Sequence, residues 1–366
     1  MCLCNYGQGV VAAMSAVREF MGLSMYHSSD EMVLQWLKEN QFKQVIVMLI
    51  DGMGAHQIQQ HCDATDFLKT HCAKIIDTVY PPTTVAATTS ILTGKQPCET
   101  GWLGWQQYFS DIDQNLQMFL NQDYYTMDQR KDRYTYQALP IKTMIEEAEE
   151  KGIPAKELFP YWKDDGAKSF EELCHQVVKE SQSQDKKLIY AYWDGYDSFM
   201  HKHGESAKES ADMLRGFDEI LANTMSWLSK DSGLMILADH GHIDVRCKYL
   251  VDYPDLIECF SHMPGLEPRT IAFYIKDGKK EIFKNLFIRY FQNDFKLFTK
   301  DEIIDRKLFG DGELHPAFTS FLGDFVACAT FDLVLDWNPL YEVKGAHAGM
   351  TKEEMKIPLI LYKAGN

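Results

Sequence analysis

The chain has 366 residues and a formal net charge of −16, with 45% hydrophobic and 25% charged residues. This balance is ordinary for a globular protein and excludes a chain that is disordered throughout. The acidic charge argues against long nucleic acid as a partner, because such binding needs clustered Lys and Arg. Bound dications could still attract a small phosphate ester.

The first residues do not show the pattern that is typical of a signal peptide. No Lys or Arg precedes Arg18, whereas a signal peptide needs a basic segment before its apolar run, and residues 10–17 predict an amphipathic helix. No apolar stretch approaches the roughly 20 residues that cross a bilayer. We therefore expect a cytoplasmic protein that is not integrated into a membrane.

Three apolar runs predict buried strands that end in polar side chains. They cover residues 44–50, followed by Asp51; residues 187–193, followed by Asp194 and Asp197; and residues 233–238, followed by Asp239 and His240. Continuous apolar runs are typical of parallel strands covered by helices on both faces. Helical patterns over 143–152 and 207–228 lie between strands, which predicts an α/β, doubly wound, mostly parallel sheet flanked by helices. Ligands of such sheets bind beyond the carboxyl ends of the strands.

Two segments depart from this alternation within what we expect to be a single domain over 1–366. The segment 102–136 is rich in aromatic residues that follow no clean period, and we expect it to be an excursion near the site. The segment 262–330 predicts a small inserted α+β subdomain, with strands over 269–275 and 295–298 and an amphipathic helix over 279–291.

The polar residues at the strand ends are candidate metal ligands. Asp239 and His240 are adjacent on a tight turn, where both can reach one ion. Asp197 and His201 are four apart, so they share a face if the chain is helical there. Each has a simpler alternative: Asp51 as a helix N-cap, and the Asp239–His240 pair as a cap with a surface histidine.

Two further segments complete the set of candidates. His347 lies among small residues in Gly-Ala-His-Ala-Gly, where the backbone can approach an ion closely, although a glycine-rich surface loop is the alternative. Thr84 follows two prolines and leads into a helix whose N-terminus would favour an anion. Thr84 is the candidate nucleophile, and the alternative is that Thr83 or Thr84 is merely an N-cap.

In order along the chain, these motifs resemble the alkaline phosphatase superfamily, and within it the type I phosphodiesterase and nucleotide pyrophosphatase family. The matching segments are Asp51-Gly-Met-Gly, Pro-Pro-Thr-Thr84 with Thr-Gly94-Lys-Gln-Pro97 and Gly101, Asp197 with His201, Asp239-His240-Gly241, and Gly-Ala-His347-Ala-Gly-Met-Thr. The resemblance covers residues from about 45 to 362 and implies an alkaline-phosphatase-like fold.

The resemblance also implies the roles of these residues. Asp51, Asp239 and His240 would hold one metal that also activates Thr84, while Asp197, His201 and His347 would hold the other. Both ions are expected to be zinc, with manganese as an alternative, and to lie roughly 3.5–4 Å apart. Two dications against three carboxylates leave a positive site, so an acidic protein could bind phosphate there.

One position departs from the diesterase pattern. Ala87 stands three residues after the nucleophile, where these enzymes commonly carry an asparagine that binds a phosphate oxygen. We therefore expect that contact from the backbone near Val85, or from Thr88 or Thr89. Trp102, Trp105 and Tyr108 are expected to line the site and stack on a base, with core packing of the excursion as the alternative.

These observations predict a two-metal phosphoric-ester hydrolase, of the phosphodiesterase or nucleotide pyrophosphatase type, that forms a phosphothreonine at Thr84. The expected partner is a small phosphate ester such as a nucleotide or nucleotide derivative. The alternatives are a phosphomonoesterase or phosphomutase of the same superfamily, or a non-catalytic metal-binding scaffold. The motifs do not indicate an oligomeric state.

Overall fold

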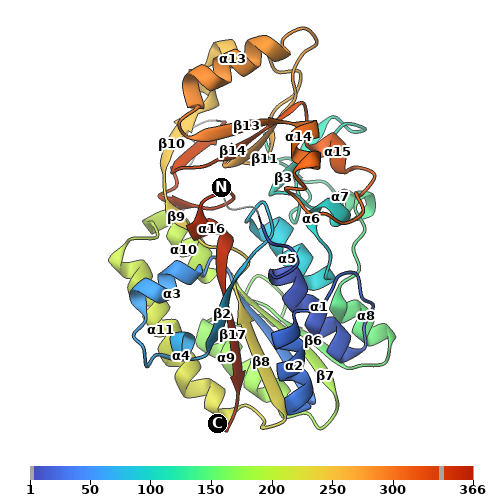
Figure 1. The fold of residues 1–366 in the computed structure, drawn as a ribbon, viewed down its shortest axis with the longest axis vertical. Helices are drawn as coiled ribbons and strands as arrows, with labels where there is room; N and C mark the ends of the chain where they lie inside the picture. Colours follow the sequence, from blue (N-terminus) through green and yellow to red (C-terminus); the bar gives the residue numbers. More distant parts are fainter. Residues whose placement is uncertain (1–3, 338–341, 366) are drawn as a thin grey trace.

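The computed structural model describes residues 4–337 and 342–365. Its main sheet has six strands in the order β2–β17–β8–β1–β7–β6 (Figure 1). Their bounds are β1 (Gln44–Ile50), β2 (Cys72–Asp77), β6 (Ala155–Leu158), β7 (Lys187–Trp193), β8 (Ser232–Leu237) and β17 (Lys356–Lys363). Strands β8, β1, β7 and β6 are parallel, and β17 is antiparallel to both of its neighbours.

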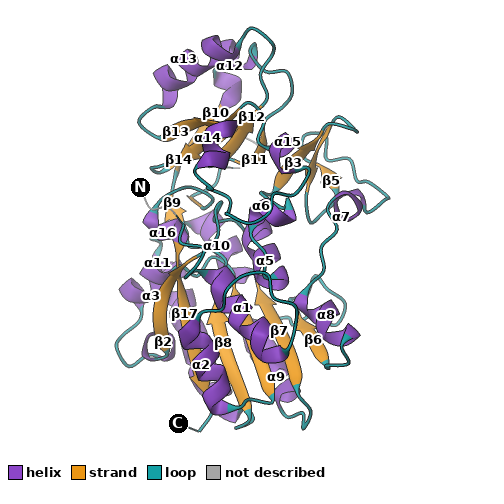
Figure 2. Ribbon diagram, turned by 45° about the vertical axis from the view of Figure 1, so that its right-hand side comes forward, coloured by secondary structure: helices purple, strands orange, loops and turns teal. Residues whose placement is uncertain are grey.

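Helices cover both faces of the main sheet (Figures 1 and 2), which confirms the predicted α/β architecture. On one face, four helices contact one another in series: α2 (Glu31–Asn40), α1 (Val10–Met21), α5 (Thr84–Thr93) and α8 (Met144–Glu150). On the other face, α11 (Lys208–Thr224) contacts α3 (Ala55–His61), α4 (Phe67–Thr70), α9 (Phe170–Ser181) and α10 (Gly195–His203).

The helix predicted over residues 10–17 exists as α1, but it is not amphipathic in its surroundings. Every residue from Val10 to Arg18 is buried, since α1 lies between α2 and α5. A helix that is covered on all sides needs no polar face, and the small Ala and Val side chains of α1 allow its neighbours to approach closely. The expectation of a polar face was wrong for this reason.

A second sheet, which we call the upper sheet, has seven antiparallel strands in the order β13–β14–β12–β11–β3–β4–β5. Their bounds are β3 (Gln106–Phe109), β4 (Gln114–Gln117), β5 (Gln122–Asp123), β11 (Gly265–Glu267), β12 (Thr270–Phe273), β13 (Phe295–Thr299) and β14 (Phe325–Ala329). Leu266 of β11 pairs with Gln106 of β3, so the aromatic segment and the later α+β segment form one layer. Figure 2 shows this layer above the end of the main sheet that carries α5 and α10.

Shorter elements connect and cover the two sheets. They are α6 (Pro97–Thr100), α7 (Tyr134–Ala138), β9 (Ile243–Asp244), β10 (Arg246–Tyr249), α12 (Pro254–Ile257), α13 (Lys280–Phe291), α14 (Lys300–Asp305), α15 (Phe318–Phe321), β15 (Leu333–Asp336), β16 (Gly345–Ala346) and α16 (Lys352–Met355). The phenylalanines of α13 pack into a cluster with those of the upper sheet. Within the described residues, no helix is long and apolar enough to span a membrane.

Candidate active site

The first cluster consists of Asp51, Asp239 and His240, which follow β1 and β8 at the same edge of the main sheet. These strands are parallel neighbours, so their carboxyl ends meet. The Nε2 atom of His240 lies 3.3 Å from Oδ1 of Asp51 and 3.5 Å from Oδ2 of Asp239. Those two carboxylate oxygens are buried and have no hydrogen-bond partner.

Unpartnered buried oxygens are costly unless a cation satisfies them. Burial, together with the nearby carboxylates of Asp239 and Asp197, raises the pKa of Asp51 well above its ordinary value. Burial also raises the pKa of Asp239. Two carboxyl groups that are hard to ionise beside one imidazole form a donor set that fits a divalent cation.

The second cluster consists of Asp197, His201, His242 and His347, whose candidate ligand atoms all lie within 4.8 Å of one another. Asp197 and His201 share a face of α10, as their spacing predicts, and His201 Nε2 lies 3.4 Å from Asp197 Oδ2. His347 returns to the site after β16, and its Nε2 lies 3.8 Å from Asp197 Oδ1. The stacked rings of His240 and His347, with centroids 3.7 Å apart, place the two clusters side by side.

Backbone carbonyls orient two of these imidazoles. His201 Nδ1 lies 2.9 Å from the carbonyl of Gly345, and His347 Nδ1 lies 3.1 Å from that of Pro82. A carbonyl only accepts, so each Nδ1 carries a proton, which leaves each Nε2 facing Asp197 as the candidate ligand atom. A Cβ at Gly345 would lie 2.7 Å from the carbonyl oxygen of Met200, so this close approach requires glycine.

The charges of this cluster act on one another. Burial alone would raise the pKa of Asp197, but His201, His242 and His347 lower it well below its ordinary value. Burial and the nearby His240 lower the pKa of His347, so this imidazole tends to be neutral, which is the form that binds metals. The donor set of one carboxylate and several imidazoles fits zinc as well as other divalent ions.

His242 was not among the residues predicted from the sequence. It is fully buried, and its Nε2 donates to Asp197 Oδ1 at 3.1 Å, while its Nδ1 has no partner. This contact fixes the orientation of the carboxylate that His201 and His347 also face. The sequence does contain a sign of this role: His242 is only two residues after His240, so both imidazoles follow the same strand.

Thr84 begins α5 beside the first cluster. Its hydroxyl lies 3.2 Å from His240 Nε2 and 3.4 Å from Asp51 Oδ2. Tyr192, the penultimate residue of β7, donates a short hydrogen bond to the same Asp51 oxygen, a contact that the sequence analysis did not identify. The backbone N–H groups of residues 84–86 have no acceptor in the described part of the chain, so the start of α5 presents free donors next to the threonine hydroxyl.

The other predicted contacts with the phosphate group differ in their surroundings. Ala87 is buried in α5 and offers no polar side-chain group. The Thr88 hydroxyl donates to the carbonyl of Thr84 at 2.6 Å and is therefore engaged within the helix. The Val85 side chain is buried, so only its backbone N–H is free to serve as a donor.

The three aromatic residues predicted to contact the substrate lie in different environments. Trp102 has no exposed surface, its indole N–H donates to the carbonyl of Leu139, and it packs in the core of the upper layer. It cannot stack on a ligand from there, so the packing alternative describes Trp102. Tyr108 is nearly buried and stacks on His262. Trp105 is partly exposed and packs at the edge of the same core.

An α/β sheet that carries two adjacent Asp/His clusters, one of them beside a threonine hydroxyl, defines a class of protein, the metal-dependent hydrolases of phosphoric esters. A family model for type I phosphodiesterase / nucleotide pyrophosphatase matches residues 45–347. The chain belongs to this family, which confirms the resemblance inferred from its motifs.

Solved structures of other proteins share the fold. Murine ectonucleotide pyrophosphatase/phosphodiesterase 5 has a TM-score of 0.67 at 15% identity, over 86% of this chain and 87% of its own. An inactive variant of that protein was solved in complex with AMP. Phosphonoacetate hydrolase from Sinorhizobium meliloti 1021, in complex with phosphonoformate, has a TM-score of 0.63 at 16% identity, over 87% and 89% of the two chains. No curated protein sequence matches this chain.

Proposed function

We propose that the chain cleaves phosphodiester or pyrophosphate bonds of a nucleotide or nucleotide derivative, with Thr84 as the nucleophile. The observation that carries this proposal is the position of the Thr84 hydroxyl, within 3.4 Å of Asp51 and 3.2 Å of His240, at a helix start with free N–H groups. Family membership supports the reaction class. The AMP complex of a structural neighbour supports a nucleotide-type substrate.

The two side-chain clusters would each hold one divalent metal ion. Asp51, Asp239 and His240 would hold one divalent ion beside Thr84, and Asp197, His201 and His347 would hold the second. Two such ions, when bound, supply Lewis acidity to the phosphoryl and leaving oxygens. We propose zinc for both, because each site combines carboxylate and imidazole donors, which zinc accepts.

Thr84 attacks phosphorus through its hydroxyl oxygen, which forms the Thr84 O–P bond as the bond to the leaving oxygen breaks. The hydroxyl proton leaves to Asp51 Oδ2, which lies 3.4 Å from the hydroxyl oxygen, and passes on to solvent, while the leaving oxygen takes a proton from solvent. The free N–H groups of residues 84–86 donate to a phosphoryl oxygen where charge develops. Water then cleaves the phosphothreonine and regenerates Thr84.

A phosphomonoesterase is the second candidate, favoured by one observation. Ala87 removes the amide that diesterases commonly use, so the phosphoryl pocket has one donor fewer to recognise a diester. However, the contacts described around the two clusters include no Lys or Arg to balance a dianionic group. Because a monoester dianion would lack a cationic side-chain partner here, we propose the diester as the preferred substrate.

The test combines elemental analysis with a panel of nitrophenyl monoesters and diesters and a nucleotide diester. Two equivalents of zinc per chain and faster hydrolysis of the diesters are expected. Acid quenching during turnover of a labelled ester should trap phosphate on Thr84, which peptide mapping would locate. A preference for monoesters, or the absence of label on Thr84, would overturn the corresponding part of the proposal.

A further inference from the structure

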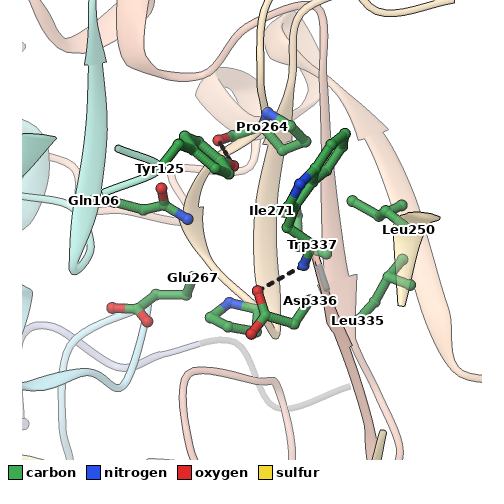
Figure 3. Close-up of a pocket in the computed structure, with 11 residues that line it drawn as sticks. Gln106, Tyr125, Leu250, Pro264, Glu267, Ile271, Leu335, Asp336 and Trp337 are labelled. Carbon is green, nitrogen blue, oxygen red and sulfur yellow. Dashed lines mark hydrogen bonds between the residues drawn. The ribbon is translucent and has the colours of Figure 1, made fainter. Parts of the chain in front are cut away.

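Glu267 is a buried carboxylate of the upper sheet that lies against the nucleophile turn, outside both clusters. It is the last residue of β11, and only 6% of it is exposed. Its Oε1 accepts two short hydrogen bonds, from the Thr83 hydroxyl at 2.5 Å and from the backbone N–H of Trp105 at 2.6 Å. In Figure 3 its carboxylate points away from Asp336 and Trp337, which line the same small cavity of about 10 Å³.

The hydrogen bond from Thr83 is informative because of where Thr83 lies. Thr83 occupies the N-cap position of α5 with an extended backbone, φ −142° and ψ 150°. A threonine at this position ordinarily accepts a hydrogen bond from an N–H group of the first helical turn. Thr83 makes no such bond.

Four other helices of this chain provide an internal comparison. Thr143, Thr299 and Thr351 occupy the N-cap positions of α8, α14 and α16 with extended backbones at φ −76°, −72° and −72°. In each case the threonine side chain accepts from the N–H of the glutamate three residues later. Ser169 caps α9 at φ −146°, close to the φ of Thr83, and its side chain accepts from the N–H of Glu172. Thr83 differs because its hydroxyl donates to the carboxylate of Glu267, which belongs to β11 of the upper sheet.

We propose that Glu267 is a positioning residue that keeps the start of α5 uncapped. By accepting from the Thr83 hydroxyl, it holds that oxygen away from the helix, so the N–H groups of residues 84–86 stay free for a phosphoryl oxygen. The inference rests on the proposed function, because it assumes that this helix start receives the phosphoryl group.

The property required of Glu267 is its acceptor oxygen and not its charge. A negative charge beside an anion site is unfavourable in itself, so a carboxylate at this position needs a compensating role. Burial raises the pKa of Glu267 to about 7, so both protonation states are accessible near neutral pH. The carbonyl-type oxygen of either state can accept from Thr83 and Trp105.

Binding of inorganic phosphate to the metal-loaded enzyme, measured by calorimetry, tests the inference without turnover. Glu267→Leu should weaken phosphate binding by about fivefold, since the released Thr83 hydroxyl can turn back and compete for the helix N–H groups with the strength of an N-cap. Glu267→Gln keeps an acceptor and should bind phosphate at least as tightly as the wild type. The double variant Glu267→Leu/Thr83→Val has no hydroxyl to form a cap and should regain the wild-type affinity.

Each alternative has its own outcome. Tighter binding by Glu267→Leu would mean that Glu267 acts through its charge, and a double variant as weak as Glu267→Leu would mean that it does not act through Thr83; either result overturns the inference. Glu267→Leu and the double variant Glu267→Leu/Thr83→Val both leave the Trp105 N–H unpaired. Their thermal stabilities should therefore fall by similar amounts, whereas their phosphate affinities should differ.

A further variant guards against misfolding of the Glu267→Leu protein. Thr83→Val alone should keep phosphate affinity within about twofold of the wild type. The hydroxyl that it removes is bonded to Glu267 and does not cap α5 in the wild type. A loss beyond about fivefold would contradict the inference. If the wild-type, metal-loaded protein fails to bind phosphate at all, the proposed function fails first, which separates the two failures.

Discussion

Arg269, which precedes β12 of the upper sheet, and Glu354 of α16 form an ion pair with no exposed side-chain surface. Arg269 Nε donates to Glu354 Oε1 at 2.7 Å, and Nη2 donates to Oε2 at 2.8 Å. The guanidinium also donates to two backbone carbonyls. Glu354 in turn accepts from the backbone N–H of Gly349 at 2.7 Å, two residues after the ligand candidate His347. The pair therefore connects the upper sheet with the second cluster.

Arg269→Met keeps much of the side-chain volume and removes all of these donors. It leaves the Glu354 carboxylate buried without its countercharge, and removal of one partner of such a pair costs about 3–5 kcal/mol. Urea denaturation of the metal-loaded protein should show a loss of this size. Elemental analysis should show reduced occupancy of one metal, because the loop that carries His347 is less well held.

Two further variants decide between explanations. Arg269→Met/Glu354→Leu removes both charges and should recover a large part of the lost stability. Arg246 pairs with Asp294 and Asp332 but is itself 46% exposed, so Arg246→Met should cost less than about 1 kcal/mol. If Arg269→Met were as mild as Arg246→Met, or if the double variant were no more stable than Arg269→Met, the reasoning about the buried charge would be refuted.

Four further predictions address other parts of the molecule. Thr84→Ala should abolish turnover and leave metal content and fold largely intact, whereas Thr83→Ala should be much milder; the reverse order in an ester assay would move the nucleophile by one residue. His242→Ala should weaken metal binding by about 10- to 100-fold, since it frees the Asp197 carboxylate, and unchanged affinity in a chelator competition would remove that role. The pKa of Glu267 is about 7 in the folded protein against 4.5 in the unfolded chain, so the folded state binds the carboxyl proton more tightly. The protonated Glu267 therefore stabilises the fold below pH 4.5, and this stabilisation is lost as the pH rises toward 7. Metal-free wild type should therefore lose stability over that window relative to metal-free Glu267→Gln, and parallel pH profiles of the urea midpoints would contradict this. Trp102→Ala should lower stability by about 3–5 kcal/mol through the cavity that it leaves, with KM for a nucleotide diester unchanged; a raised KM at unchanged stability would place Trp102 at the substrate.

The parts of the structure that the sequence predicts well are those with a local signal. The strands 44–50 and 187–193 were predicted with the bounds that β1 and β7 have, because each is a continuous apolar run closed by a polar residue. The carboxyl ends of neighbouring parallel strands meet, which is why the sequence predicts that Asp51 and Asp239 lie together. The spacing of Asp197 and His201 predicts a shared face if the chain is helical there, and α10 confirms that helix.

The parts that the sequence did not predict depend on long-range pairing. The pairing of Leu266 with Gln106 joins segments about 160 residues apart, and no periodicity within either segment encodes that register. Glu267 reaches Thr83 only because of this pairing, so its role was invisible in the sequence. Trp102 packs against Phe119 and Tyr136 of the same aromatic segment, and no period in that segment predicts these contacts.

β17 lies in the interior of the main sheet, between β2 and β8, although it is the last strand of the printed sequence. A ribosome adds roughly 5–20 residues per second, so the stretch between His240 and Lys363 takes on the order of ten seconds to synthesise. During that interval β2 and β8 have emerged but cannot yet be joined, and each presents an unpaired edge on which other chains could add a strand. The risk of aggregation is therefore concentrated in the interval before β17 emerges and closes the sheet.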